Sequence, residues 1–330
     1  MNFMKKSSIF TISISSAALF CSQALAKSED QWLQGSATAN TTLKYQLFVP
    51  GSSDPNPQRP LVVALAGCSQ SGSELDGISG LSKLAQKENF AVLFPEQSPA
   101  NNTLRCWNWF EKSQQSRDGK EVKTISQMID QVVENYGFNP SQIYLVGFSA
   151  GAAMTQILSS CYPEKFAGAL LHSGLAFGSA VSMVEAYTAM SVGSSKPVAS
   201  LAQAATNCAL PNNTKMVPTF VVHGTADYTV NFKNGTQTMD QLLEMARLQR
   251  QKNPSSTPEI KKGMSGILAG KSLSGQLQSY ETTTGNVVFQ TLWINGLAHA
   301  WSGGGPGKYS NPSGPNALGA AWEFFMSQGE

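Results

Sequence analysis

The strongest chemical signal in the chain is a serine held between two glycines, in the motif Gly147-Phe148-Ser149-Ala150-Gly151. An apolar, β-branched run precedes this motif and a helical pattern follows it, so the serine would sit on a sharp turn between a strand and a helix. Side chains at the two glycine positions would collide in such a turn. A bare string of this type is more often an ordinary tight turn, but the strand and helix around it favour a nucleophilic serine.

A nucleophilic serine needs a base, and the chain has three histidines, His172, His223 and His299. His299 follows the last predicted strand, which agrees with the chain order of serine, acid and histidine that this kind of turn accompanies. The other two histidines lie at the ends of core strands and are expected to be structural. Of the acids between Ser149 and His299, Asp227 stands out because a short turn joins it to a predicted strand. It would fix the tautomer of His299 and stabilise the imidazolium.

The tetrahedral oxyanion that such a serine generates needs two hydrogen-bond donors, normally backbone N–H groups. We expect Ala150, the residue after the nucleophile, to supply one of them. Cys68, in the loop after the predicted strand at 61–65, is expected to supply the other through its N–H. Cys68 as a thiol nucleophile is the weaker interpretation, because the histidine is already assigned and an exported chain favours disulfides.

The elements that must position these residues read as alternating strands and helices. Short apolar runs predict strands at 61–65, 91–94, 143–146, 169–172, 219–223 and 287–293, with an additional edge strand at 45–49. Helical spacing predicts helices at 81–89, 125–136, 150–161, 239–251 and 317–326. Apolar strands that alternate with helices predict an α/β fold, with a mostly parallel sheet covered on both faces. Two polar segments, 176–214 and 253–284, are expected to be loop excursions over the edge that carries the site.

The first 26 residues have the basic start, short apolar middle and Ala24-Leu25-Ala26 end of a secretory signal peptide. We therefore expect a secreted protein, or a periplasmic one if it is retained, with residues 27–330 as a single catalytic domain. Loss of Lys5 and Lys6 with the signal leaves 21 of the 23 basic residues, equal to the 21 acidic ones. A neutral chain argues against nucleic acid or an anionic membrane as its main partner. The oligomeric state stays open.

Four cysteines follow the signal: Cys68, Cys106, Cys161 and Cys208. An even number in an exported chain favours two disulfides, and their spacing alone allows three connectivities. That spacing is unlike paired metal ligands, and a chain with three histidines gives a zinc site little support.

The chain resembles the family of secreted poly(3-hydroxybutyrate) depolymerases and their feruloyl and acetylxylan esterase relatives. The resemblance is carried by an ordered set of motifs from about Leu61 to Gly304. These motifs are Gly67-Cys68-Ser69-Gln70, Phe94-Pro95-Glu96-Gln97, Arg105-Cys106-Trp107-Asn108-Trp109-Phe110, Gly147-Phe148-Ser149-Ala150-Gly151, His172-Ser173-Gly174, His223-Gly224-Thr225-Ala226-Asp227 and His299-Ala300-Trp301-Ser302-Gly303-Gly304.

This resemblance implies an α/β-hydrolase fold and an extracellular carboxylic-ester hydrolase that needs no metal or organic cofactor. It also implies the pairings Cys68–Cys106 and Cys161–Cys208. Ala66 stands where the family commonly has a histidine. The sequence ends soon after its last predicted helix, so a separate polymer-binding module is not expected, and ester hydrolysis is a firmer expectation than degradation of solid polymer.

The substrate-binding prediction concerns tryptophans near the expected site. Trp301, two residues from His299, and Trp107 are predicted to contact substrate, although such tryptophans are often part of the core.

The expected function is hydrolysis of a polymeric or oligomeric ester of 3-hydroxybutyrate or a related hydroxyalkanoate, through an acyl-Ser149 intermediate. A feruloyl or acetylxylan esterase is the first alternative, and an inactive hydrolase-like binding protein is the second.

Overall fold

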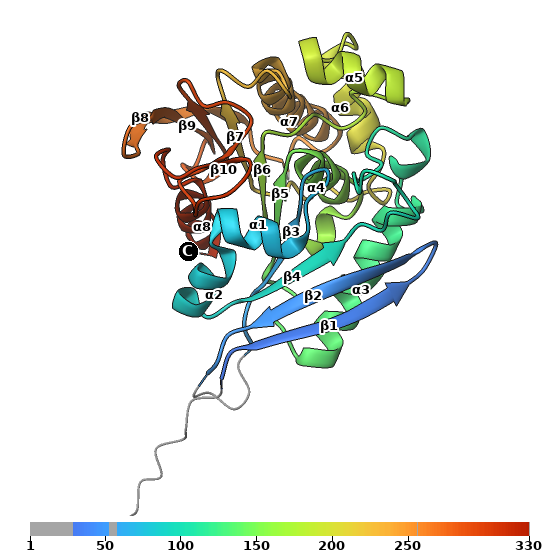
Figure 1. Cartoon of the computed structure of the whole chain (residues 1–330). Helices are drawn as coiled ribbons and strands as arrows, with labels where there is room; N and C mark the ends of the chain where they lie inside the picture. Colours follow the sequence, from blue (N-terminus) through green and yellow to red (C-terminus); the bar gives the residue numbers. More distant parts are fainter. Residues whose placement is uncertain (1–28, 53–57, 256, 330) are drawn as a thin grey trace, which may run out of the picture.

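The computed structural model describes residues 29–52, 58–255 and 257–329. Its centre is a ten-stranded sheet with the strand order β1-β2-β4-β3-β5-β6-β7-β10-β9-β8 (Figure 1). The six strands from β4 to β10 in this order run parallel, and the strands outside them pair antiparallel. The strands are β1 Gln31–Thr38, β2 Thr42–Val49, β3 Leu61–Leu65, β4 Ala91–Glu96, β5 Ile143–Phe148, β6 Gly168–His172, β7 Thr219–Gly224, β8 Ile260–Ala269, β9 Ser274–Thr282 and β10 Val287–Ile294, with the separate short pair β11 Trp301–Ser302 and β12 Ser310–Asn311.

Helices cover both faces of this sheet. One face carries α1 Gly72–Ser79, α2 Leu81–Glu88 and α8 Ala317–Met326. The other carries α3 Lys120–Tyr136, α4 Ala150–Cys161 and α7 Phe232–Lys252, with α5 Met183–Val192 and α6 Val198–Thr206 packed beside α7. Short 3-10 turns occur at Lys112–Gln114, Pro163–Lys165 and Ser327–Gly329. The mostly parallel sheet between two helical layers confirms the predicted α/β architecture.

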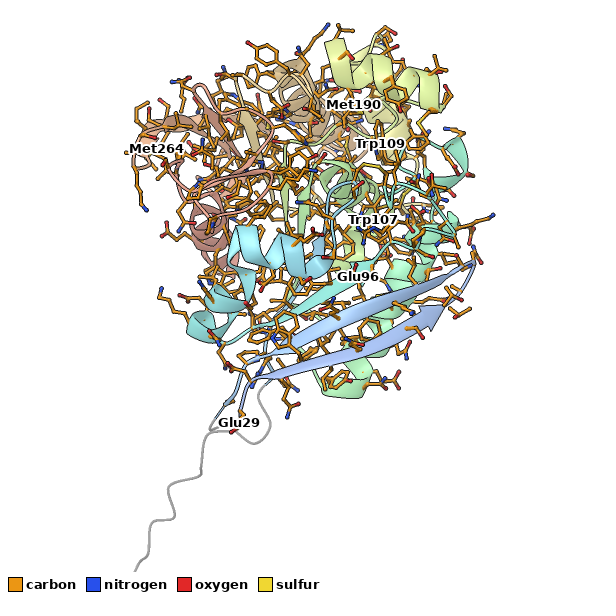
Figure 2. All side chains as sticks on the ribbon, in the orientation of Figure 1. Glu29, Glu96, Trp107, Trp109, Met190 and Met264 are labelled. Atoms are coloured by element: carbon orange, nitrogen blue, oxygen red, sulfur yellow. A yellow bond between two sulfur atoms is a disulfide. The ribbon has the colours of Figure 1, made fainter. Side chains whose placement is uncertain are left out.

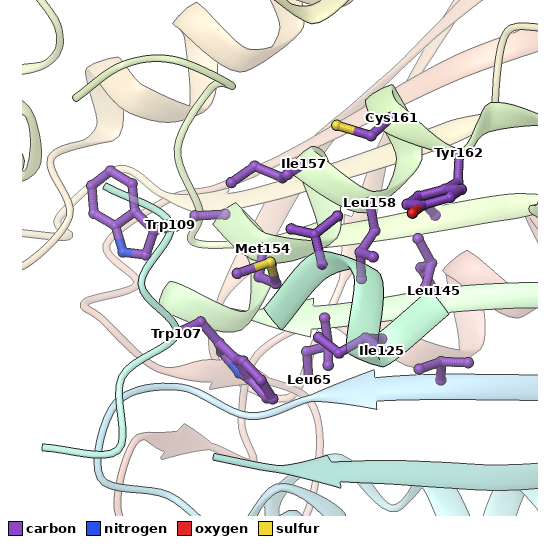
Figure 3. Packing of buried hydrophobic residues seen from close by; sticks show 14 of the residues in the cluster. Leu65, Trp107, Trp109, Ile125, Leu145, Met154, Ile157, Leu158, Cys161 and Tyr162 are labelled. Carbon is purple, nitrogen blue, oxygen red and sulfur yellow. The ribbon is translucent and has the colours of Figure 1, made fainter. Parts of the chain in front are cut away.

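Strand pleating divides the core into two layers. In β3, Val62 packs with α1 and α8, whereas Val63 and Leu65 pack with α3 and α4, because successive side chains of a strand point to opposite faces. Figure 3 shows residues of the second layer, among them Leu65 and Leu145 of the sheet and Met154 and Leu158 of α4. The central strands are buried on both faces, which explains why they are apolar without alternation.

Three expectations about the periphery of the sheet were wrong. Segment 253–284 is not a loop excursion, because it contains β8 and β9, which extend the sheet as an antiparallel hairpin. Segment 176–214 was expected to be loop as well, but it contains the helices α5 and α6. The strand predicted at 45–49 is not an edge strand, since β1 pairs along its outer side.

A disulfide joins two helical segments of the same face of the sheet, away from the predicted site. Cys161, the last residue of α4, is bonded to Cys208, which follows α6. Within the described ranges no helix has the length and apolarity to cross a membrane. The predicted signal peptide lies outside the described residues.

Candidate active site

Ser149 occupies the turn between β5 and α4 with backbone angles φ 56° and ψ −121°. This conformation is rare for a residue other than glycine and costs about 1–3 kcal/mol, so the surrounding structure must hold it in place. The Ser149 N–H donates to the carbonyl of His172 at 2.9 Å, which fixes the turn to the end of the neighbouring strand β6. The strain is therefore built into the sheet edge that presents the Ser149 hydroxyl.

The two glycines of the motif are required by close packing, as the sequence predicts. A Cβ at Gly147 would lie 2.4 Å from Thr155 Oγ1 and 2.5 Å from the carbonyl oxygen of Gly151. A Cβ at Gly151 would lie 1.9 Å from the carbonyl oxygen of Leu65. The start of α4 thus packs directly against the end of β3, and no side chain fits between them.

His299 lies in the loop after β10 and contacts the serine. Its Nε2 is 2.9 Å from Ser149 Oγ, and its Nδ1 is 2.7 Å from Asp227 Oδ2. A carboxylate only accepts, so Nδ1 carries the proton and the neutral ring presents Nε2 as an acceptor to the serine hydroxyl. The structure therefore brings together the three side chains that the sequence singles out, as one hydrogen-bonded relay.

Asp227 is buried, and its two oxygens have different partners. Oδ1 accepts from the backbone N–H groups of Thr229 at 3.0 Å and Val230 at 2.8 Å, and Oδ2 receives the His299 ring. Two bonds from rigid backbone orient the carboxylate, and they leave Oδ2 free to direct the imidazole.

The loops that carry Asp227 and His299 are joined to each other. The N–H of Thr225 donates to the carbonyl of Ile294 at 2.9 Å, and the N–H of Ala226 donates to that of Leu297 at 3.1 Å. These bonds continue the parallel pairing of β7 with β10 beyond the strands. The spacing between Asp227 and His299 is thereby set by backbone pairing.

Aromatic rings enclose the imidazole of His299. The ring of Phe148 stacks on it with centroids 5.2 Å apart, and Tyr309 approaches edge-on at 6.2 Å. The His299 side chain is 8% exposed, so these apolar neighbours shield the relay from bulk water.

The two predicted oxyanion donors flank the serine. Within the part of the chain that the structure describes, the N–H groups of Cys68 and Ala150 have no hydrogen-bond acceptor. A Cβ built on Gly67 would lie 3.3 Å from Ser149 Cβ, which places the Cys68 loop beside the serine. An unpaired N–H at the start of a helix, such as that of Ala150, suits an anion.

Three contacts brace the loop that carries Cys68. Gln70 Oε1 accepts from the N–H of Gly67 at 3.1 Å, and the indole N–H of Trp107 donates to the carbonyl of Ala66 at 3.1 Å. The third is the disulfide from Cys68 to Cys106, the pairing that the resemblance implies. The loop is therefore anchored on both sides of its predicted donor.

The segment on the other side of this disulfide is organised by a buried acid. Glu121 accepts from the N–H of Asn108 at 2.8 Å and from the side-chain amide of Gln97 at 2.6 Å. Burial raises the pKa of the Glu121 carboxyl, and these donors act in the opposite direction. Gln97 also donates to the carbonyl of Cys106 at 3.0 Å, so the network reaches the disulfide and through it the donor loop.

The prediction that Trp107 and Trp301 contact substrate needs correction, because both side chains are fully buried. Trp107 packs in the layer around α3 and α4 (Figures 2 and 3). Its indole N–H donates to the carbonyl of Ala66. Trp301 stacks on His172 with ring centroids 4.9 Å apart. Both indoles stabilise the loops of the site from within, and neither presents a surface to a ligand.

The remaining histidines are buried, as expected of structural ones. His172 accepts the N–H of Ser302 at 3.2 Å through Nε2, and its Nδ1 lies 3.1 Å from Ser173 Oγ. His223 donates through Nε2 to the carbonyl of Val230 at 2.8 Å. Burial lowers the pKa of both imidazoles, that of His172 well below 6.5, so both are neutral at neutral pH.

Sequence reasoning missed that His172 supports the segment that follows His299. Its bond to Ser302 holds the chain three residues after His299, and the Trp301 ring stacks on the same imidazole. Nothing in the local sequence of either segment indicates this contact, because it joins positions 130 residues apart. Among the residues that the structure describes, no cluster of three or more His, Cys, Asp or Glu side chains could bind a metal ion.

Comparison of the sequence with known proteins identifies the family of the chain. A family model described as "Esterase PHB depolymerase" matches residues 43–254. "Poly(3-hydroxyalkanoate) depolymerase C" of Paucimonas lemoignei is 32% identical over 240 residues, which cover 73% of this chain and 54% of that protein. "Probable acetylxylan esterase A" of Aspergillus clavatus is 30% identical over 139 residues, which cover 42% of this chain and 44% of that protein. The chain spans about half the length of these curated relatives.

A solved structure shares the fold. "Acetyl xylan esterase from Aspergillus awamori" aligns with a TM-score of 0.66 over 89% of this chain and 99% of that one, at 21% identity. The fold is therefore that of the α/β hydrolases. Together with the match over most of the chain, it shows that the protein belongs to the esterase PHB depolymerase family.

Proposed function

We propose that this protein is an exported carboxylic-ester hydrolase in which Ser149 is the nucleophile, His299 the general base and Asp227 the residue that orients the histidine. The observation that carries the proposal is the relay of 2.9 Å from Ser149 Oγ to His299 Nε2 and 2.7 Å from His299 Nδ1 to Asp227 Oδ2. The free N–H groups of Cys68 and Ala150 support the assignment of the oxyanion site.

The relay suits hydrolysis in two steps. Ser149 Oγ attacks the ester carbonyl while His299 Nε2 takes the hydroxyl proton, and the carbonyl oxygen becomes an oxyanion next to Cys68 and Ala150. Collapse of this intermediate breaks the ester bond, and His299 returns the proton to the leaving alcohol. Water then attacks the acyl-Ser149 ester by the same route and releases the acid.

We propose a hydroxyalkanoate oligomer or polymer as the substrate. The supporting observation is the depolymerase of Paucimonas lemoignei, whose similarity covers 73% of this chain. A feruloyl or acetylxylan ester is the second candidate, supported by the acetylxylan esterase similarity over 42% of the chain. The two disulfides favour an oxidising compartment outside the cytoplasm. Residues 27–330 would then be one catalytic domain, built on the single large sheet.

A fluorophosphonate probe with p-nitrophenyl butyrate as the soluble substrate tests the assignment of the nucleophile. The wild type and a Ser141→Ala control, which alters an exposed serine before β5, should both be labelled and active. Ser149→Ala should be neither. A labelled Ser149→Ala variant, or one that hydrolyses the ester at the wild-type rate, would show that the relay is not the reactive centre and favour the binding-protein alternative.

A substrate panel tests the ester class. Oligomers of 3-hydroxybutyrate should be hydrolysed with a higher kcat/KM than methyl ferulate or acetylated xylan. The reverse order would replace the hydroxyalkanoate proposal with the plant cell-wall alternative while leaving the nucleophile unchanged.

A further inference from the structure

Helix α5 has the reverse of the usual amphipathic arrangement. Its buried side carries the small residues Ala186 and Ala189, whereas its solvent side carries large apolar ones. Val184 is 77% exposed and Tyr187 is 62% exposed. We define the α5 face by its four exposed large apolar side chains, which are Met183, Val184, Tyr187 and Val192. A surface helix normally turns such side chains toward the core, so this cluster indicates a surface that binds something.

The α5 face carries no charge. Glu185 is the one ionisable acid of the helix, and it is bound to Lys196 at 2.9 Å. The same carboxylate accepts from the N–H of Val181 at 3.2 Å. The exposed positions between the apolar residues are Thr188 and Ser191, which are polar but uncharged. A surface of this composition matches an uncharged, largely aliphatic partner.

The α5 face lies at the edge of the sheet that carries the relay. The helix follows the carboxyl end of β6, and β6 pairs with β5, the strand that ends just before Ser149. Its last turn is joined to the segment after Asp227, because the N–H of Asn231 donates to the carbonyl of Met190 at 2.7 Å. Tyr228, which neighbours Asp227 in the chain, is 88% exposed. Figure 1 shows α5 at the outside of the molecule, with solvent on its far side.

We propose that the α5 face adsorbs the protein onto the surface of solid hydroxyalkanoate polyester and so presents the polymer to Ser149. This inference rests on the proposed function and adds the physical state of the substrate. The polyester repeat is an aliphatic ester without ionised groups. Contact with the apolar α5 face therefore removes no charged group from water, and the release of water from the two apolar surfaces favours binding.

Two other occupants fit the α5 face less well. An anionic membrane would favour Lys or Arg around the apolar side chains, and α5 contains neither. A second copy of the chain would need a standard interface of about 20–30 residues a side, far more than the few side chains of this face. A solid polymer can be bound by a small patch, because many copies of the repeat lie within its reach.

The test measures adsorption and catalysis separately. Adsorption to poly(3-hydroxybutyrate) granules is measured in the Ser149→Ala background, so that hydrolysis does not erode the surface. The double variant Val184→Ser, Tyr187→Ser should bind at least tenfold less protein at equal concentration. A matched control, Met264→Ser with Ile267→Ser, removes side chains that are 78% and 71% exposed on β8, and it should bind like its parent. With Ser149 intact, both double variants should hydrolyse soluble p-nitrophenyl butyrate at the wild-type rate.

Equal adsorption by the α5 variant and its parent would overturn the inference, as would an equal loss in the β8 control. The inference would also be overturned if the α5 substitutions converted a dimer to a monomer without changing adsorption, or abolished binding to neutral phosphatidylcholine vesicles but not to granules. A wild-type protein that does not hydrolyse the soluble ester would contradict the proposed function instead. The adsorption result would still stand, because its measurement does not depend on catalysis.

Discussion

The close packing between α4 and β3 makes a sharp prediction for Gly151→Ala. The new Cβ would lie 1.9 Å from the carbonyl oxygen of Leu65 and 2.6 Å from that of Ala66. Carbon and oxygen atoms in contact need roughly 3.4 Å, so the start of α4 must move away from β3 by about 1.5 Å. Both neighbours are backbone, and no side-chain rotation can absorb this displacement.

The displacement would separate the two N–H groups that we propose to bind one oxyanion. Ala150 moves with α4, whereas Cys68 is held through the loop after β3 and its disulfide. A misplacement of about 1 Å at a reacting centre costs on the order of 100-fold in rate. We therefore expect kcat/KM for p-nitrophenyl butyrate to fall at least 100-fold in a Gly151→Ala protein that keeps its near-ultraviolet circular dichroism.

Two further variants make this measurement decisive. Gly266→Ala on β8 places its Cβ in open space and should leave kcat/KM unchanged. In Gly67→Ala the new Cβ would lie 2.9 Å from the flexible end of Gln70 and 3.3 Å from Ser149 Cβ, so a smaller loss of kcat/KM is expected. This variant replaces Gly151→Ala in the test if Gly151→Ala does not fold. A folded Gly151→Ala enzyme with kcat/KM within threefold of the wild type would refute the proposed geometry of the oxyanion site.

Three other perturbations test the relay, the second disulfide and a buried histidine. Asp227→Asn should lower kcat by about 10⁴-fold in ester hydrolysis, because the amide can favour the wrong tautomer of the imidazole, and a loss under tenfold would argue against its orienting role. Replacing Cys161 and Cys208 with Ala should lower the free energy of unfolding in urea by about 4 kcal/mol with activity at 25 °C retained, since a loop of 47 residues is released far from the relay. Burial lowers the pKa of His172 well below 6.5, so the unfolded chain binds a proton that the native state does not as the pH falls below 6.5. The free energy of unfolding should therefore decline on acidification by up to about 1.4 kcal/mol per pH unit from this group, and a His172→Gln variant that declines as steeply as the wild type between pH 7.5 and 5.5 would contradict this.

The relay could be predicted from sequence because parallel strands impose a common geometry on distant residues. Ser149, Asp227 and His299 each follow a mostly apolar strand, and the carboxyl ends of parallel strands meet at one edge of the sheet. The bounds of α4 and α8 also agree with the predicted helices, since their apolar content is high and turn residues flank them.

The elements at the periphery of the sheet could not be predicted, because contacts that the local sequence does not encode define them. Most side chains of β8 are exposed, and Lys261 and Lys262 remove the alternation that marks a strand, so pairing with β9 defines it. Helix α5 was not predicted, because its large apolar residues face solvent and not the core. Trp107 and Trp301 were wrongly predicted to contact substrate. A position near the site in the sequence does not distinguish a buried ring that supports the site from one that contacts a ligand.

The outer strand β8 also offers a site for attaching this protein to a support. Its two neighbouring lysines, Lys261 and Lys262, are exposed on the edge of the sheet, two strands removed from the β10 loop that carries His299. Figure 1 shows β8 and α5 at different margins of the molecule. Attachment to a support by a site-specific bond at this strand would leave the margin that carries α5 facing outward, which suits the proposed action on insoluble material.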